Sequence, residues 1–180
     1  MWLINLVENL LSVTRIEEGR LNLHITEDLV DDVITEALHH VNRKSVEHHI
    51  TVRHKEDYLL AKMDAKLMVQ VVINIVDNAI KYTPKGSNIL IKTWKQGDKA
   101  VISIADDGDG IPDEMKERVF DMFYSGANKI ADSRRSLGLG LSLCRSIVNA
   151  HGGKITVSDN TPHGTVFTIT LSAGEVEIHE

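Results

Sequence analysis

Cysteine is almost absent from this chain of 180 residues, since Cys144 is the only one. A single thiol cannot form an internal disulfide or build a cysteine-rich zinc cluster, so we expect a reducing, cytoplasmic environment. Any metal chemistry would therefore have to use oxygen or histidine ligands.

Long apolar runs are missing as well. A membrane-spanning helix needs about 18 or more consecutive apolar residues, whereas the most apolar stretch, residues 69–76, is interrupted by Gln70 and Asn74. The first residues carry no basic region ahead of an apolar stretch, which argues against a secretory signal. We therefore expect no direct membrane contact by this segment.

Basic charge is not in excess. The chain has 20 lysines and arginines against 26 aspartates and glutamates, a formal net charge of -6. A general nucleic-acid binder usually carries a basic stripe, so we expect no nucleic-acid partner. Hydrophobic residues make up 42% of the chain and charged residues 26%, a composition that is ordinary for a packed globular protein and excludes disorder throughout.

Hydrophobic periodicity predicts an α+β protein in which helices cover one face of a mostly antiparallel or mixed sheet. Helices are predicted over 2–17, from 28 onward, and over 65–82, 113–121 and 139–150. Strands are predicted over 21–25, 50–54, 58–62, 89–94, 100–105, 154–158 and 166–171. The turn at Gln96-Gly97-Asp98 predicts a hairpin, and the stretch 124–136 lacks periodicity, which predicts a mobile loop.

The opening helix has no capping residue ahead of it and runs to Gly19, a residue type that suits a helix end. From the residues alone, it fits either the cut end of a longer helix or an ordinary core helix of this domain.

Polar residues share one face of the helix predicted over 65–82. At 100° per residue, Asn78 lies about 40° and Lys81 about -20° from Asn74, while the apolar residues gather on the opposite side. Such a face is commonly just solvated surface, but two asparagines are unusual in a good helix. The alternative is a binding role, with an asparagine oxygen on Mg²⁺ and Lys81 against a phosphate.

A first glycine loop follows Asp106, which stands at a predicted strand end. A calcium loop is excluded, because placing Gly110 at position six of an EF-hand puts Ala105 and Lys116 where acids are required. A carboxylate only accepts hydrogen bonds, so Asp106 could accept from the exocyclic amine of adenine, whereas guanine presents a carbonyl there. With Gly108 and Gly110 allowing a flat ligand to approach the backbone, the loop favours adenine.

A second glycine loop, with Gly138 and Gly140, precedes a predicted helix, where bare backbone amides can bind an anion. It is not a Walker sequence, since no G-K-[ST] follows, and it is not a dinucleotide fingerprint, since the third glycine is missing. Alone, this pair is weak evidence for a phosphate site.

Taken in order, four segments resemble the N, G1, F and G2 boxes of sensor histidine kinases. They are Asn74-Ile-Val-Asp-Asn78-Ala-Ile-Lys81-Tyr82, Asp106-x-Gly108-x-Gly110-Ile111-Pro112, Phe120-x-x-Phe123-Tyr124 and Gly138-Leu139-Gly140-Leu141. The resemblance implies the Bergerat ATP-binding fold, a two-layer α/β sandwich that gyrase and MutL proteins also use.

By this resemblance, Asn78 would bind Mg²⁺, Asn74 would support the metal and phosphate site, and Lys81 would hold phosphate, which makes these three the expected catalytic residues. The ATP-binding residues would be Asn74, Asn78, Lys81, Tyr82, Asp106, Gly108, Gly110, Ile111, Phe123, Gly138, Leu139, Gly140 and Leu141. The loop over 124–137 would be an ATP lid that brings Arg134 or Arg135 near the phosphates.

The opening helix resembles the end of the second helix of the dimerisation and phosphoacceptor domain, especially in potassium-responsive sensors of the Kdp type. The resemblance implies a helix remnant of that domain at 1–20, a catalytic ATP-binding domain at 21–175 and an acidic tail at 176–180. It also implies a full-length kinase that is a homodimer anchored in the inner membrane, with the phosphoacceptor domain and a response regulator as partners.

The sequence departs from the family pattern at several points. Ser136 stands where the G2 box often begins with another glycine, and Ser125 stands where arginine is common. No histidine lies in the acceptor motif, in which His is followed by an acid and then Leu-Arg. We therefore expect the chain to transfer the γ-phosphoryl group of Mg-ATP to a histidine on a separately supplied domain, and not to itself.

Two alternatives stay open: a non-catalytic nucleotide-sensing module, and a gyrase-like or MutL-like ATPase. The ATPase is disfavoured because Asn74, which by resemblance replaces the general base, cannot accept a proton as a carboxylate would. The pairs His39-His40 and His48-His49 are expected to be solvated rather than metal ligands. Cys144 has apolar neighbours and is predicted to be a buried structural thiol.

Overall fold

A five-stranded mixed sheet forms one layer of the computed structural model, which describes residues 23–45, 47–121 and 140–175. The strand order is β2-β4-β5-β7-β6, with β2 parallel to β4 and the other neighbours antiparallel. The strands are β2 (His49–His54), β4 (Asn88–Gln96), β5 (Lys99–Asp106), β6 (Lys154–Asp159) and β7 (Thr165–Ser172). A two-stranded antiparallel sheet pairs β1 (Thr26–Leu29) with β3 (Leu60–Met63).

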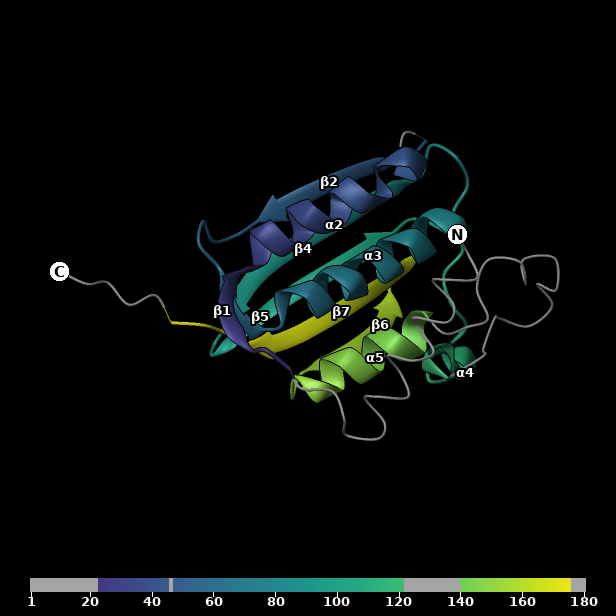
Figure 1. Ribbon diagram of the computed structural model, residues 1–180. Coiled ribbons are helices and arrows are strands. Elements are labelled where there is room, and N and C mark those ends of the chain that lie inside the picture. The colour runs from purple at the N-terminus through teal and green to yellow at the C-terminus, as the bar shows by residue number, and fades with distance from the viewer. Residues whose placement is uncertain (1–22, 46, 122–139, 176–180) are drawn as a thin grey trace.

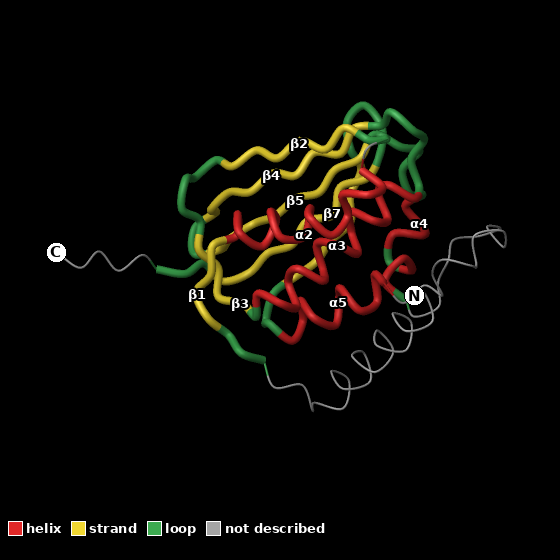
Figure 2. The backbone as a smooth tube through the Cα atoms, turned by 45° about the horizontal axis from the view of Figure 1, so that its top comes forward, coloured by secondary structure: helices red, strands yellow, loops and turns green. Residues whose placement is uncertain are grey.

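Three helices form the second layer and lie across one face of the large sheet (Figure 1, Figure 2). They are α2 (Val30–Ser45), α3 (Ala65–Lys81) and α5 (Gly140–Ala150). A short helix α4 (Asp113–Lys116) and a 3-10 turn η1 (Arg118–Phe120) follow β5. The predicted α+β fold, a two-layer sandwich with helices on one face of a mixed sheet, is confirmed.

Helix α3 is held in place mainly by one apolar face, which packs on the sheet. Asp64 caps its N-terminus, with the carboxylate accepting from the Leu67 N–H at 3.4 Å. Its inward side chains are all buried: Met68, Val71, Val72, Ile75, Val76 and Ala79. The helix ends at Lys81, within one residue of its predicted end, because Pro84 and the left-handed Gly86 (φ 86°) cannot continue it.

The core lies between α3 and the strands that it crosses. The hairpin of β4 and β5, confirmed by the register Gln96↔Lys99, turns through Gly97 at φ 61°. Buried and more exposed positions alternate along β4, whereas the middle of β5 is buried at five consecutive positions. Phe120 of η1 meets Phe167 of β7 edge to face, with 6.1 Å between ring centroids. The end of β5 beside this pair is therefore firmly supported.

The first strand and helix begin later than predicted. Of the residues predicted as a strand over 21–25, the described ones (23–25) are not in a strand, and β1 instead occupies Thr26–Leu29. The reason is tertiary: β3 pairs with these four residues, and the Val30 N–H donates to the Leu59 carbonyl at 3.0 Å, where α2 starts. Local alternation of polarity could not reveal that partner.

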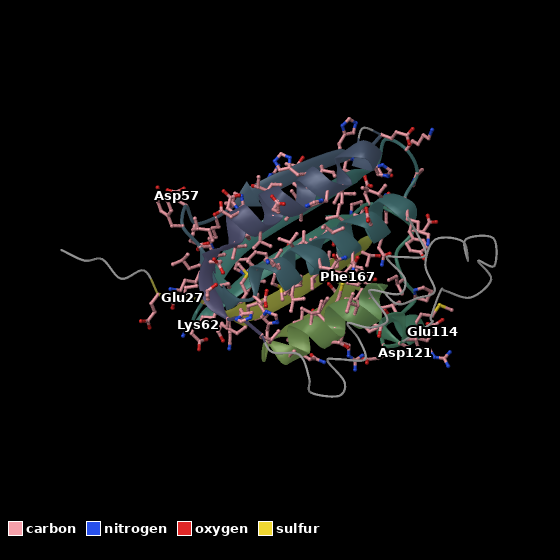
Figure 3. The ribbon with its side chains drawn as sticks, viewed as in Figure 1. Glu27, Asp57, Lys62, Glu114, Asp121 and Phe167 are labelled. Atoms are coloured by element: carbon pink, nitrogen blue, oxygen red, sulfur yellow. The ribbon has the colours of Figure 1, made fainter. Side chains whose placement is uncertain are left out.

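Strand β3 also holds the end of the described chain. Ala61 bridges Ala173, and the Gly174 N–H donates to the Leu60 carbonyl at 2.8 Å. The Glu175 N–H reaches the Glu27 carboxylate on β1 at 3.4 Å. Both ends of the domain thus meet at one edge, where Figure 3 labels Glu27, on the opposite side from Glu114 beside α4.

Some predictions fall outside the described residues: the opening helix, the loop over 124–136, the tail at 176–180, and Phe123, Gly138 and Leu139. Within the described residues, no helix is long and apolar enough to cross a membrane.

We expect Ile102→Ala to lower the free energy of unfolding by about 2–5 kcal/mol, because Ile102 is fully buried in the middle of β5 and its loss leaves a cavity. Urea denaturation measures this change. Thr156→Ala, on the exposed side of β6, is the control and should stay within about 0.5 kcal/mol. A loss at Ile102 no larger than that of the control would contradict this placement of the core.

Candidate functional site

The carboxylate of Asp106, the last residue of β5, is held by backbone donors from two distant segments. Its Oδ1 accepts from the Gly108 N–H at 3.0 Å and from the Thr165 N–H at 3.2 Å. Oδ2 makes no hydrogen bond within the described part of the chain. One oxygen is thus fixed by the protein, and the other can accept from a ligand.

Burial raises the pKa of the Asp106 carboxyl above its usual value, and the charge of Asp107 adds to the effect. The two backbone hydrogen bonds from Gly108 and Thr165 act in the opposite direction, because they stabilise the ionised form. A partly desolvated acceptor discriminates strongly between ligand donors and acceptors, since water cannot replace a missing bond there.

The end of α3 lies against the loop that follows Asp106. A Cβ at Gly108 would come within 2.9 Å of the Thr83 Cγ2 atom and 3.5 Å of the Tyr82 carbonyl oxygen. Gly110 has φ 79°, and a Cβ there would lie 3.2 Å from the carbonyl oxygen of Gly164. Close approach therefore explains both glycines, and the structure brings the predicted N and G1 boxes together.

Asn74 is turned into the packing between α3 and α5. Its Oδ1 accepts from Gln70 Nε2 at 3.1 Å, while its Nδ2 is buried without a hydrogen-bond partner among the described residues. The same amide faces the thiol of Cys144 on α5. Burial raises the pKa of that thiol to about 12, and the prediction that Cys144 is a buried thiol is confirmed.

Asn78 and Lys81 follow on the same helix, and both are half-buried. The Lys81 ammonium lies 5.2 Å from the centroid of the partly exposed Tyr82 ring. The Asn78 side chain makes no hydrogen bond to a described residue. The opposite side of the helix is buried, as predicted, but the Asn74 amide lies in the packing with α5 and is less accessible than the predicted polar face required.

Gly140 is the first residue of α5, and a Cβ there would meet nothing within 4 Å among the described residues. Packing of the described residues therefore does not explain this glycine, unlike Gly108. Leu141 and Ile111 are partly buried and pack against the core.

One expectation about the histidine pairs was wrong. His48 is only 8% exposed, and its Nε2 lies 2.9 Å from Thr83 Oγ1, which itself donates to the Ala79 carbonyl at 2.6 Å. His48 lies just ahead of β2 and packs against Thr83, beyond the end of α3, where its ring is buried. No cluster of three or more His, Cys, Asp or Glu side chains suited to a metal occurs among the described residues.

The turn between β6 and β7 contributes site residues that the sequence did not reveal. Asn160 Nδ2 donates to the Asp106 carbonyl at 2.8 Å, and His163 Nδ1 lies 3.0 Å from the Gly108 carbonyl. Thr165 begins β7 and holds the Asp106 carboxylate. The Pro and Gly between two predicted strands indicate a turn, but nothing local indicates which loop it touches.

Residues 63–175 match the family described as histidine kinase-, DNA gyrase B-, and HSP90-like ATPases. The chain belongs to this family, as its four boxes predicted.

Its similarity is to the histidine kinases of that family. Sensor protein KdpD of Clostridium acetobutylicum is 42% identical over 170 residues, which cover 94% of this chain and 19% of that protein. The catalytic domain of histidine kinase ThkA aligns at 30% identity with a TM-score of 0.74, over 83% of this chain and 95% of that one. Histidine kinase ThkA in its complex with response regulator protein TrrA aligns at 28% identity with a TM-score of 0.73, over 94% of this chain and 48% of that one.

The chain spans only 19% and 20% of the length of two curated relatives, so it corresponds to one part of such proteins. The predicted histidine-kinase ATP-binding class is confirmed. The roles assigned to single site residues remain predictions.

We expect Asp106→Asn to stabilise the ligand-free chain, and to do so more at about pH 7 than at about pH 4. The pKa of Asp106 is raised above 3.8 in the folded state. The folded state therefore binds the proton more tightly than the unfolded state, and stability from this group is lost as pH rises through the raised pKa. The amide keeps the Oδ1 acceptor but has no charge to desolvate.

Urea denaturation of both proteins across this pH range measures the difference. A difference in the free energy of unfolding that is constant or shrinks as pH rises would contradict the burial argument.

Proposed function

We propose that this chain is the catalytic part of a two-component sensor histidine kinase, which binds Mg-ATP and transfers the γ-phosphoryl group to a histidine of a dimerisation domain. The observation that carries the proposal is the Asp106 carboxylate, with Oδ1 fixed by the Gly108 and Thr165 N–H groups. The shared ancestry with histidine kinase catalytic domains supports it.

The ligand acceptor at this site is Asp106 Oδ2. The exocyclic amine of adenine would donate to it, whereas the carbonyl of guanine would place two acceptors face to face in a partly buried site. Tyr82, at the end of α3, and Ile111 would line the pocket, and Gly108 and Gly110 would let the base approach the backbone. We therefore infer ATP rather than GTP as the nucleotide.

The polar side chains of α3 suit a Mg²⁺ ion that is already bound to the phosphates of ATP and to water. Asn78 offers one neutral amide oxygen, and Mg²⁺ accepts oxygen ligands while keeping waters and phosphate oxygens. The described residues contain no carboxylate or histidine cluster that would hold the ion by itself. Mg²⁺ would neutralise phosphate charge, with Lys81 as a further cation and the buried Asn74 amide supporting the site.

Positioning would supply most of the catalysis. The bond between the γ-phosphorus and its bridging oxygen breaks, a phosphorus–nitrogen bond forms at the acceptor imidazole, and ADP leaves with the bonding electron pair. A neutral imidazole is already nucleophilic, so no strong base is required, and Asn74 cannot serve as one. The task of this chain is to hold the γ-phosphoryl group in line with the incoming nitrogen.

The remaining assignments follow the resemblance to Kdp-type, potassium-responsive sensors. We propose that 1–20 ends the dimerisation helix, that 21–175 is the catalytic domain and that 176–180 is a tail. The phosphoacceptor domain and a response regulator are the partners, in a homodimeric kinase anchored in the inner membrane. The complex of ThkA with TrrA supports a response-regulator partner.

Asp106→Asn should weaken Mg-ATP binding about 10- to 100-fold, since the lost acceptor and the opposed amide cost about 1–3 kcal/mol. Isothermal titration calorimetry measures the affinity. Asn149→Ala, an exposed asparagine in the last turn of α5, is the matched control and should bind like the wild type. Equal affinity in all three proteins would exclude the proposed adenine site.

Phosphoryl transfer is tested by incubating the chain with γ-labelled Mg-ATP, with and without a dimerisation domain of a KdpD-type kinase. Label should enter the added domain and not this chain, and Asn78→Ala should reduce transfer by about tenfold or more through loss of the metal ligand. Label in this chain alone would overturn the assignment. Binding without transfer would favour a nucleotide-sensing module, and phosphate release without an acceptor would favour an ATPase.

A further inference from the structure

The turn between β6 and β7, residues 160–164, is bonded to the backbone of the loop that carries the adenine acceptor. Asn160 Nδ2 lies 2.8 Å from the Asp106 carbonyl oxygen, and His163 Nδ1 lies 3.0 Å from the Gly108 carbonyl oxygen. A carbonyl oxygen only accepts, so both side chains donate, and the His163 ring carries its proton on Nδ1.

The orientation of the Asn160 amide is determined by its surroundings. Its Oδ1 accepts from the Thr161 N–H at 2.9 Å while its Nδ2 donates to Asp106, so both ends of the amide are used. The backbone is tied as well, since the Asn160 N–H donates to the Gly164 carbonyl at 3.0 Å. Asn160 therefore presents a fixed donor to Asp106.

Gly164 brings the same turn into direct contact with Asp106. Its φ is 114°, and a Cβ there would lie 2.0 Å from the Asp106 carbonyl oxygen. The next residue, Thr165, donates its N–H to Asp106 Oδ1. Residues 160–165 thus hold Asp106 at both ends, by its peptide carbonyl and by its carboxylate.

We propose that the β6–β7 turn aims the Asp106 carboxylate at the nucleobase and so sets purine selectivity, with Asn160 as the main positioning residue and His163 as the second. This inference rests on the proposed function. A hydrogen bond weakens steeply as its angle departs from linearity, so a small rotation of the Asp106 peptide would weaken the bond from Oδ2 to the adenine amine.

The alternative is that the turn only stabilises the fold. Against this, Thr161, Pro162 and His163 are exposed and Asn160 is half-buried, and none of them belongs to the hydrophobic core. Losing the Asn160 amide removes no core packing, and its contacts are with the site loop and with the turn itself. The turn is therefore placed to affect the site more than the overall stability.

The test compares Asn160→Ala, His163→Ala and His163→Asn with the wild type and with the control Asn149→Ala, all in the full chain. Calorimetry gives the affinities for Mg-ATP and Mg-GTP, and thermal unfolding shows that each variant is folded. Transfer to a supplied dimerisation domain gives KM and kcat.

We expect Asn160→Ala to weaken Mg-ATP binding about tenfold, as for one lost hydrogen bond to a positioned group. Its preference for ATP over GTP should fall by a similar factor, KM for ATP should rise, and kcat at saturating ATP should stay within about twofold. His163→Ala should show about a threefold loss, and His163→Asn should restore affinity because an amide nitrogen can replace Nδ1 as donor.

Each outcome decides a different question. If the wild type binds no Mg-ATP, the proposed function fails. If the wild type binds but Asn160→Ala keeps full affinity and selectivity, the positioning role is overturned while the proposed function stands. Equal losses for ATP and GTP together with a lower kcat would also overturn it in favour of a purely structural role, and if Asn160→Ala does not fold, the two His163 variants decide.

Discussion

The arrangement of the site depends on one half-buried carboxylate that the fold holds in a fixed orientation. Asp106 terminates a central strand, so its backbone is fixed by the sheet, and its side chain is fixed by N–H groups of Gly108 and Thr165. Burial opposes the charged form and the backbone donors favour it. A partly desolvated acceptor is costly for the fold, so its position at a strand end favours a role in ligand binding.

Helix α3 links this carboxylate to the rest of the site. Its apolar side is buried in the core, which fixes the rotation of the helix and therefore the direction of its polar residues. Thr83, two residues past the end of α3, packs against the glycine loop, and its hydroxyl lies 2.9 Å from His48 Nε2. The residues expected to contact phosphate and those expected to contact the base thus lie on two segments that touch each other at Thr83 and Gly108.

Local sequence patterns were sufficient to predict many of the helices and strands and the family of this protein. The 3.6-residue period located α3, the turn at Gly97 located the β4–β5 hairpin, and the ordered boxes identified the family. Contacts between distant segments were not accessible: Asn160 lies 54 positions from Asp106, and only the register that pairs Ala105 with Val166 brings its turn to that loop. The burial of His48 and the shift of the first strand to β1 have the same cause, a partner elsewhere in the chain.

Strand β3 ties both the beginning and the end of the described domain to a single edge, through β1 and through Ala173. Strand β7 runs from Thr165, beside Asp106, to Ser172, just before Ala173. The contact with β3 and the Asp106 loop therefore lie at opposite ends of one strand. A pull on either end of the described chain would therefore act at the small sheet, a full strand length away from the Asp106 loop.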